Sequence, residues 1–200
     1  MIKIFRLIIL IFLLSNCQQK KECNLNVNVQ KSNDSILTKI KKEGTLKKIL
    51  TKINEPELET LKRETYRFMI MSSFGDYQIY RVTKNDNNYN ITYKKYTKYV
   101  YDPITNDEKI IDSLSKESVQ KISENDWFDI KEKLDELNFW ELPIRTNEHY
   151  LDGVAYVIEA FNLEKNVCTE RNYHATSRIS PSDSTDYSLL FKKIIMLTKK

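Results

Sequence analysis

The chain has 200 residues, of which 40% are hydrophobic and 30% charged, a composition that fits one soluble globular domain. Its formal net charge of +4 falls to about +2 without Lys3 and Arg6, which is too small to indicate nucleic-acid binding. Glycine occurs 3 times, and neither a Walker-type loop nor a Gly-x-Gly-x-x-Gly turn is present, which excludes the common phosphate-binding loops.

The first residues have the pattern of a secretory signal peptide. Lys3 and Arg6 precede an unbroken apolar run at residues 7–14. As a helix this run would cover roughly 12 Å, whereas the hydrocarbon layer of a bilayer is roughly 30 Å thick. The run is therefore too short for a stable membrane span and predicts a signal sequence at residues 1–16.

The signal sequence ends in Leu14-Ser15-Asn16-Cys17, which resembles the lipobox of bacterial lipoproteins. The resemblance implies that the chain is cut before Cys17 and that acyl chains such as palmitate are attached there. Each buried CH₂ contributes about 0.8 kcal/mol, so several chains would hold the protein in a membrane. Gln18 follows in place of Asp, and this similarity favours the outer membrane of a Gram-negative bacterium.

Residues 17–34 are polar and rich in Asn and Lys, which predicts a flexible, lipidated tether. Cys23 lies in this tether, and Cys168 lies in the body of the protein. The compartment outside the cytoplasm is oxidising, so the two thiols could form a disulfide, or they could remain unpaired.

Residues 35–200 form a single predicted domain that begins with a helical part, residues 35–64. Apolar residues recur at helical spacing over 35–54, and Pro56 ends that helix or starts a short second one. Strands with intervening turns are then predicted at residues 66–71, 77–83 and 89–100. Residues 102–113 are expected to form a loop before a fourth strand at 115–122.

Ser123 starts the clearest helix of the chain, because Asp126 follows three residues later as in a capping box. Its apolar stripe consists of Trp127, Ile130, Leu134 and Leu137. A second hairpin is predicted from residues 153–162 and 167–175, and a terminal helix from residues 187–197. Strands and helices are segregated along the chain, which predicts an α+β fold with an antiparallel sheet of five to six strands packed with helices.

From residue 66 onward, the order of several short motifs resembles a widespread family of small, often lipid-anchored bacterial proteins. The motifs are Tyr66-Arg67-Phe68, Trp127 with Leu134, Phe139-Trp140-x-Leu142-Pro143, Leu151-Asp152-Gly153, Glu159 and Arg171. Where the family pattern has a Trp after the Asp-Gly, this chain has Ala155-Tyr156. The resemblance implies a fold more than a site.

The most suggestive group of candidate binding residues is Trp140, Asp152, Gly153, Glu159 and Arg171. On adjacent antiparallel strands Glu159 and Arg171 could pair, with Asp152 and Gly153 at the mouth of the hairpin. One interpretation is a small polar pocket beside Trp140. The alternative interpretation is a turn-forming Asp-Gly and a structural cross-strand ion pair.

Seven tyrosines gather in the segment from residue 77 to residue 101, interleaved with Lys94, Lys95 and Lys98. Such a strand could bind a glycan or a protein, because tyrosine gives a large contact area at low entropic cost. The alternative is a strand whose tyrosines are half-buried and whose lysines protect an edge.

No catalytic or metal-binding set stands out, and we expect no cofactor. His149 and Asp152 alone do not make a zinc site, and the Gly-x-Ser-x-Gly elbow is absent. We therefore expect a non-enzymatic protein of the cell envelope or periplasm that binds another protein and no nucleic acid; an immunity-like role is one version. The alternatives are an envelope-polymer hydrolase with Asp152 and Glu159 as acid and base, and a small-ligand sensor.

Overall fold

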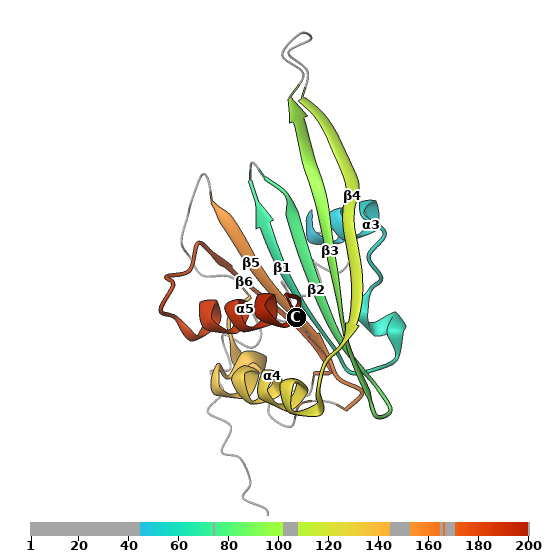
Figure 1. Ribbon diagram of the computed structural model, residues 1–200. Coiled ribbons are helices and arrows are strands. Elements are labelled where there is room, and N and C mark those ends of the chain that lie inside the picture. Colours follow the sequence, from blue (N-terminus) through green and yellow to red (C-terminus); the bar gives the residue numbers. More distant parts are fainter. Residues whose placement is uncertain are drawn as a thin grey trace, which may run out of the picture.

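The computed structural model describes residues 45–73, 75–101, 108–144, 153–164, 166 and 171–199. In this part of the chain, one six-stranded antiparallel sheet in the order β4-β3-β2-β1-β5-β6 has helices on both faces (Figure 1), which confirms the predicted α+β class. The strands are β1 Thr65–Ser72, β2 Tyr77–Asn85, β3 Asn88–Tyr101, β4 Glu108–Lys121, β5 Val154–Phe161 and β6 Tyr173–Ile179. The helices are α3 Thr45–Lys52, η1 Leu58–Leu61, α4 Glu124–Glu136, η2 Phe139–Glu141 and α5 Asp186–Leu197.

The first four strands form a meander, and the chain then crosses to the opposite side of β1. Asp86 takes a positive φ of 52° in the tight β2–β3 turn, a backbone conformation that Asp tolerates. After β4, the chain passes through α4 and η2 before β5 pairs with β1. This crossover makes β1 an inner strand, with Arg67 opposite Arg81 of β2 on one side and opposite Glu159 of β5 on the other.

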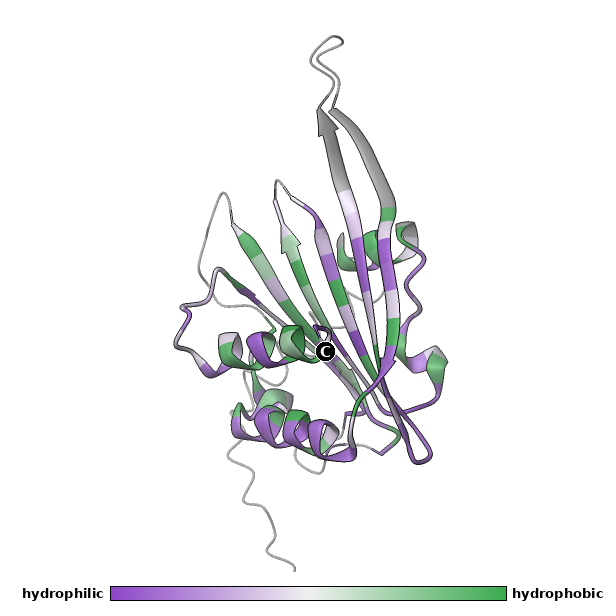
Figure 2. Ribbon diagram, in the orientation of Figure 1, coloured by the Kyte–Doolittle hydropathy of each residue, from purple (hydrophilic) through white to green (hydrophobic). Residues whose placement is uncertain are grey.

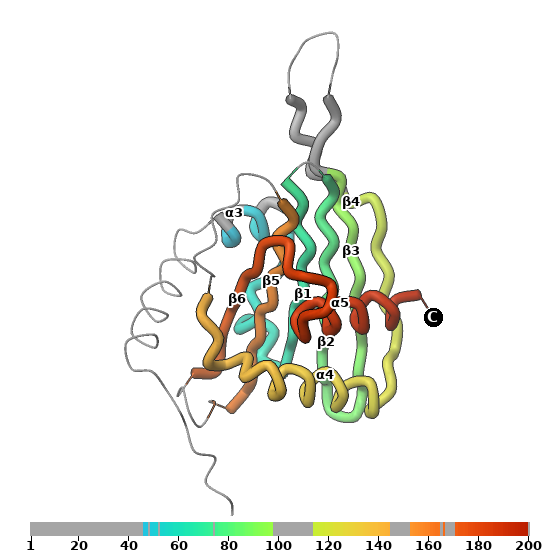
Figure 3. The backbone as a smooth tube through the Cα atoms, turned by 90° about the vertical axis from the view of Figure 1, so that its left-hand side faces the viewer, coloured from blue at the N-terminus to red at the C-terminus, as the bar shows by residue number. Residues whose placement is uncertain are grey.

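Helices α4 and α5 cover one side of the sheet, which we call the α4–α5 face (Figure 3). Successive side chains of a strand point to opposite faces, so every second residue of the inner strands contributes to the core on this side. Phe68, Tyr80 and Ile158 from the sheet pack there with Trp127 of α4 and Phe191 of α5. This apolar cluster is the largest in the described part of the chain.

The start of α4 is fixed by the capping box that the sequence predicts. Ser123 has extended backbone geometry, its Oγ accepts a hydrogen bond from Asp126 N at 3.0 Å, and Asp126 Oδ2 accepts one from Ser123 N at 3.2 Å. These bonds satisfy amide groups that the first helical turn leaves unpaired. The stripe of Trp127, Ile130 and Leu134 is thereby directed at the sheet, where all three side chains are buried.

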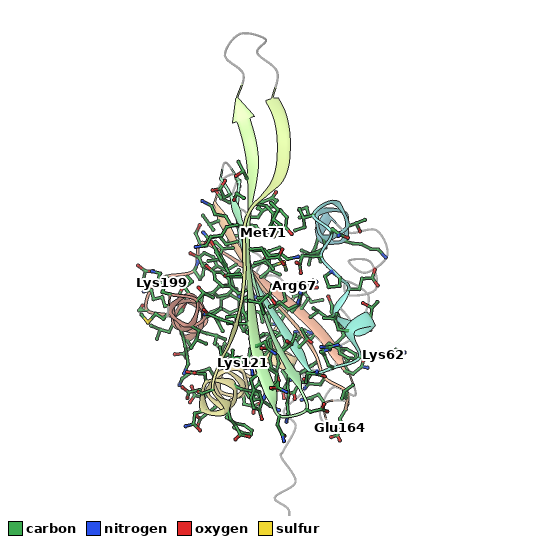
Figure 4. All side chains as sticks on the ribbon, turned by 45° about the vertical axis from the view of Figure 1, so that its right-hand side comes forward. Lys62, Arg67, Met71, Lys121, Glu164 and Lys199 are labelled. Atoms are coloured by element: carbon green, nitrogen blue, oxygen red, sulfur yellow. The ribbon has the colours of Figure 1, made fainter. Side chains whose placement is uncertain are left out.

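The other side of the sheet, which we call the α3 face, is covered by α3, η1 and the segment between them (Figure 4). Two small apolar clusters lie on it. One joins Leu50 and Ile53 to Met69 and Ile79, and the other joins Leu58 to a group around Phe161 and Tyr173. Hydrophilic residues are more frequent along β3 and β4 than along β1 and β5 (Figure 2).

Two sequence predictions of secondary structure differ from the fold. Residues 108–113 belong to β4 and not to a loop. Strand β3 continues to Tyr101 and pairs with them, with Tyr99 opposite Ile110. The second strand of the later hairpin, predicted over 167–175, runs in the structure over Tyr173–Ile179; residues 167–170 lie outside the described residues. Its polar residues Ser177 and Arg178 weakened the strand signal, although the pairing with β5 recruits both.

Among the described residues, no helix combines the length and the apolar character needed to span a bilayer.

Candidate functional site

Charged side chains are buried between the two apolar clusters of the α3 face. We call Glu55, Arg67, Arg81, Lys94 and Glu159 the buried charge cluster. Figure 4 shows Arg67 between the sheet and the α3–η1 segment. The side chains of Arg67 and Glu159 are 1% and 3% exposed, and that of Glu55 is fully buried. Burial of charge is costly unless each charge is paired and hydrogen-bonded, so the partners decide whether the cluster is structural.

Arg67 and Glu159 form the centre of the cluster. Arg67 donates from Nε to Glu159 Oε2 at 2.6 Å, and its Nη2 lies 2.5 Å from the same oxygen. Tyr173 donates from its hydroxyl to Glu159 Oε1 at 2.6 Å. Both carboxylate oxygens of Glu159 are therefore engaged, one by a cation and one by a buried phenol.

Glu55 connects this pair to the segment that covers it. Glu55 Oε2 accepts a hydrogen bond from Arg81 Nη1 at 2.6 Å and lies 3.6 Å from Arg67 Nη1. Lys94 Nζ lies 2.7 Å from Glu55 Oε1, a distance typical of an ion pair. Arg67 Nη1 also donates to the carbonyl oxygen of Pro56 at 2.7 Å. These contacts hold the stretch between α3 and η1 against the sheet.

Burial and charge move the pKa values of two groups at this site. Burial raises the pKa of the Tyr173 phenol well above its usual value, and the neighbouring Glu159 carboxylate acts in the same direction. Burial alone would lower the pKa of Lys94, but its contact with the Glu55 carboxylate outweighs this effect and the pKa is raised. At neutral pH, Tyr173 is therefore a neutral donor and Lys94 a cation, as their contacts require.

A cavity of about 80 Å³ lies next to the cluster, walled by α3, by residues around η1 and by the sheet. Its walls include Leu50, Glu57, Arg67, Glu159 and Tyr173. This volume accommodates a few water molecules, whereas ligand pockets usually measure roughly 300–1,000 Å³. No group of three or more His, Cys, Asp or Glu side chains in the described part of the chain is arranged to hold a metal ion.

The structure separates the candidate residues that the sequence grouped together. The β5–β6 register places Ala175 opposite Glu159, and Arg171 precedes β6, so Arg67 of β1 takes the cross-strand position that we expected for Arg171. Trp140 belongs to the core on the α4–α5 face, so it and Glu159 lie on opposite sides of the sheet. The structure therefore does not bring Trp140 and Glu159 together in one pocket, as one of the two interpretations of these residues required.

Gly153 has a packing role at the start of β5. Its carbonyl oxygen accepts hydrogen bonds from Ser73 N at 3.1 Å and from Ser73 Oγ at 2.9 Å. A Cβ atom here would come within 2.9 Å of Ile179 Cγ2, so any larger residue would force the Ile179 side chain to shift. Asp152 lies outside the described residues, as do Cys17, Cys23, Cys168 and His149.

The tyrosines of β2 and β3 are mostly core residues. Tyr77, Tyr80, Tyr89 and Tyr96 are between 2% and 7% exposed, and they divide between the two faces of the sheet. Tyr93 is half-buried, with its ring centroid 4.9 Å from that of Tyr80 and 5.7 Å from Lys116 Nζ. These positions favour the structural interpretation of the tyrosine pattern over a binding strip; the side chains of Tyr99 and Tyr101 lie outside the described residues.

Of this arrangement, sequence reasoning named only Glu159 as a candidate site residue, and it missed five other members: Glu55, Arg67, Arg81, Lys94 and Tyr173. A signal for the central pair was present, because Arg67 and Glu159 each interrupt an apolar strand, Tyr-Arg-Phe-Met-Ile-Met and Val-Ile-Glu-Ala-Phe. A charge in such a run needs a partner when the strand is buried on both faces.

Comparisons of the chain with known protein families, with curated proteins and with solved structures gave no match.

Proposed function

We propose that this chain is a non-enzymatic binding module of the cell envelope, anchored in the outer membrane by acyl chains on Cys17, and that its partner is another protein. The predicted signal sequence and tether supply the anchor, and the α+β body supplies the binding surface.

The observation that carries the proposal is that the carboxylate of Glu159 is buried and that both of its oxygens are bound by neighbouring side chains. A carboxylate that acts as acid or base must reach its substrate, and the two carboxyl groups of a glycosidase flank an open cleft at roughly 5–9.5 Å separation. Glu159 is 2% exposed, and Arg67 and Tyr173 occupy its two oxygens. This geometry supports a structural role for Glu159 and is unfavourable to the alternative of a polymer hydrolase.

The size of the adjacent cavity argues in the same direction. At about 80 Å³, it is smaller than the roughly 300–1,000 Å³ typical of small-molecule sites. A small-ligand sensor would need a larger concave apolar pocket, so this alternative receives no support from the α3 face.

A protein partner is favoured by apolar side chains exposed on the helical layer. Phe128 of α4 is 52% exposed, and Leu189 and Met196 of α5 are 48% and 64% exposed. Leu189 and Met196 are two helical turns apart and share one side of α5. Large apolar side chains that share an exposed surface are typical of protein interfaces.

The test is a crosslinking pull-down from native cells through a C-terminal tag, with Cys17→Ser as the unanchored control. We expect one protein to be recovered in near-equal amount with the anchored chain. Met196→Ser combined with Phe128→Ser should reduce the recovery at least fivefold. Leu163→Ser is the matched control, because Leu163 is 66% exposed but lies outside the helical layer, and it should leave recovery unchanged.

Two results would contradict the proposal. One is equal recovery of the partner by all of these variants and by a tag-only sample. The other is saturable turnover of a defined envelope polymer by the purified chain that Asp152→Ala or Glu159→Ala removes while the fold is retained.

A further inference from the structure

The two outer edges of the sheet differ in what covers them. Along β6, the chain's own residues 143 and 144 accept hydrogen bonds through their carbonyl groups. Ser177 N donates to the Ile144 carbonyl at 2.7 Å, and the Thr176 side chain donates from Oγ1 to the Pro143 carbonyl at 2.8 Å. The other edge is β4, the outermost strand beyond β3 (Figures 1 and 3). In the described part of the chain, no strand or loop adds backbone hydrogen bonds to the outer side of β4.

The backbone groups that β4 presents outward follow from its pairing with β3. Ile122 N donates to the Tyr89 carbonyl, so the backbone N–H and C=O groups of Ile122 point toward β3. In an antiparallel ladder, inward and outward groups alternate from residue to residue. With the register of Lys121 opposite Asn90 and Val119 opposite Thr92, the outward N–H and C=O groups belong to Glu117, Val119 and Lys121.

The side chains of these three residues project on the α3 face and are open to solvent. Val119 is 64% exposed and the Glu117 side chain 45% exposed, and Lys121 is also exposed. Glu117 lies 3.7 Å from Lys94 Nζ, while Lys121 takes part in none of the ion pairs found among the described residues. Along the exposed edge of β4, the apolar Val119 therefore lies between the acidic Glu117 and the basic Lys121.

We propose that β4 pairs antiparallel with β4 of a second copy of this chain, about a two-fold axis at Val119. Val119 then faces the partner's Val119, and Glu117 faces the partner's Lys121 on each side. On the other face of the sheet, Ser118 faces the partner's Gln120. The outward N–H and C=O groups of the three edge residues are satisfied, and the two sheets become one continuous sheet.

Charge complementarity singles out this register. A two-fold axis perpendicular to the sheet can pass through an outward-facing residue or through the residue between two of them. An axis at Ser118 or Gln120 would place Glu117 or Lys121 opposite Val119 and would pair no opposite charges. An axis at Glu117 or at Lys121 would place like charges directly opposite each other, which is destabilising. An axis at Val119 places an apolar pair at the centre and opposite charges on either side. The edge is therefore self-complementary, as an isologous two-fold contact requires.

The proposal does not depend on the proposed function, although a lipid anchor would strengthen the contact. A pair of edge strands buries less area than the roughly 1,200–2,000 Å² of a standard stable interface. Confinement of two copies to one membrane raises their effective concentration and so favours a weak contact.

The first test is cysteine crosslinking of the full chain in cells under mild oxidation. In a hydrogen-bonded antiparallel pair the two Cα atoms lie about 5.5 Å apart, within the range of about 4.4–6.8 Å that a disulfide spans. Val119→Cys should therefore give a disulfide-linked dimer in at least fivefold excess over the parent chain. Glu117→Cys should not, because identical positions there are offset by four residues, about 13 Å. Glu117→Cys combined with Lys121→Cys should crosslink again.

A crosslinked dimer from Glu117→Cys as strong as that from Val119→Cys would overturn the register, and no excess dimer from Val119→Cys would overturn the contact. If the pull-down recovers no partner protein but Val119→Cys still gives the crosslinked dimer, the proposed function fails and the proposed dimer stands.

The second test uses charge reversal, measured as the monomer–dimer dissociation constant of the full chain by analytical ultracentrifugation in detergent. Glu117→Lys or Lys121→Glu alone should weaken the dimer at least tenfold, and the two together should restore it to within about threefold of the parent. Val119→Pro, which removes only an outward N–H, should abolish the dimer while the thermal unfolding of the monomer is retained. Full dimerisation of Val119→Pro, or failure of the double reversal to restore the dimer, would overturn the proposal.

Discussion

On the α4–α5 face, Phe68 and Ile158 belong to one continuous apolar core, whereas their chain neighbours Arg67 and Glu159 form a buried ion pair on the α3 face. The same two strands thus contribute to two kinds of packing. The first kind stabilises through apolar area and close contact. The second adds little net stability as a pair, but the loss of one partner leaves a charge without compensation.

This contrast explains why the α3 face needs a dedicated covering segment. Its apolar clusters are small, and the charges between them require partners from outside the sheet. Glu55 and the Pro56 carbonyl provide those partners from the stretch between α3 and η1. The covering segment is therefore held by directional bonds, while α4 and α5 are held by an apolar interface.

The largest expected effect comes from removing the central cation. In Arg67→Met, the apolar stem of the side chain is kept but Glu159 loses its cation, and Tyr173 remains as its donor. Breaking a buried pair in this way typically costs about 3–5 kcal/mol, so we expect a loss of this size in the free energy of unfolding, measured by urea denaturation.

The control for Arg67→Met is the same substitution combined with Glu159→Gln. The second change removes the uncompensated charge but keeps an oxygen to accept the hydrogen bond from Tyr173. We expect the double variant to regain about 1–3 kcal/mol over the single variant. If the double variant were as unstable as Arg67→Met alone, the lost bond to Pro56 or lost packing would be responsible, and the charge argument for this face would be wrong.

His174 is a buried side chain of the α4–α5 face whose protonation changes the stability of the fold at acidic pH. Its Nε2 lies 3.1 Å from the Leu142 carbonyl, which can only accept, so Nε2 carries the proton. Among the described residues, Nδ1 has no hydrogen-bond partner. Burial lowers the pKa of His174 to about 4, and the charges of Arg171 and Arg178 act in the same direction.

The free energy of unfolding should therefore decrease as the pH is lowered from about 6.5 to about 4. The unfolded chain takes up a proton on His174 near pH 6.5, about the ordinary pKa of histidine, whereas the folded chain does so only near pH 4. Between these values the unfolded state binds more protons, so we expect a loss on the order of 3 kcal/mol as pH falls through the window. His174→Phe should flatten the curve of unfolding free energy against pH. Identical slopes for both chains would refute the assignment.

A smaller effect is expected at the start of α4. Ser123→Ala removes the side chain that accepts the hydrogen bond from Asp126 N. Loss of a cap of this kind costs about 0.5–2 kcal/mol, which should lower the midpoint of thermal unfolding by several degrees. Ser184→Ala, at an exposed position outside the helices, is the control and should leave the midpoint unchanged. Equal midpoints for both variants would mean that the apolar stripe alone fixes α4.

The features that the sequence predicted are local ones. The capping box of α4 depends on residues three apart, and the strands β1 to β3 follow from alternation and turns within a few residues. The buried charge cluster depends on contacts between distant segments. Arg67 and Glu159 are 92 positions apart, and they meet because β5 pairs with β1 and not with β4. Local periodicity gives no information about strand order. The sequence therefore suggested an ion pair between Glu159 and Arg171, which is nearer along the chain.

The smallest expected effect comes from the loss of a cation at a partly exposed site, which allows a direct comparison with Arg67→Met. Lys131 of α4 forms an ion pair with Glu64 at 2.8 Å, but the Lys131 side chain is 36% exposed. Water solvates both groups once the pair is broken, so Lys131→Met should change the free energy of unfolding by no more than about 1 kcal/mol. Added salt should weaken the native pair and reduce even this difference. A loss as large as that in Arg67→Met would mean that burial is not what distinguishes the charges of the α3 face.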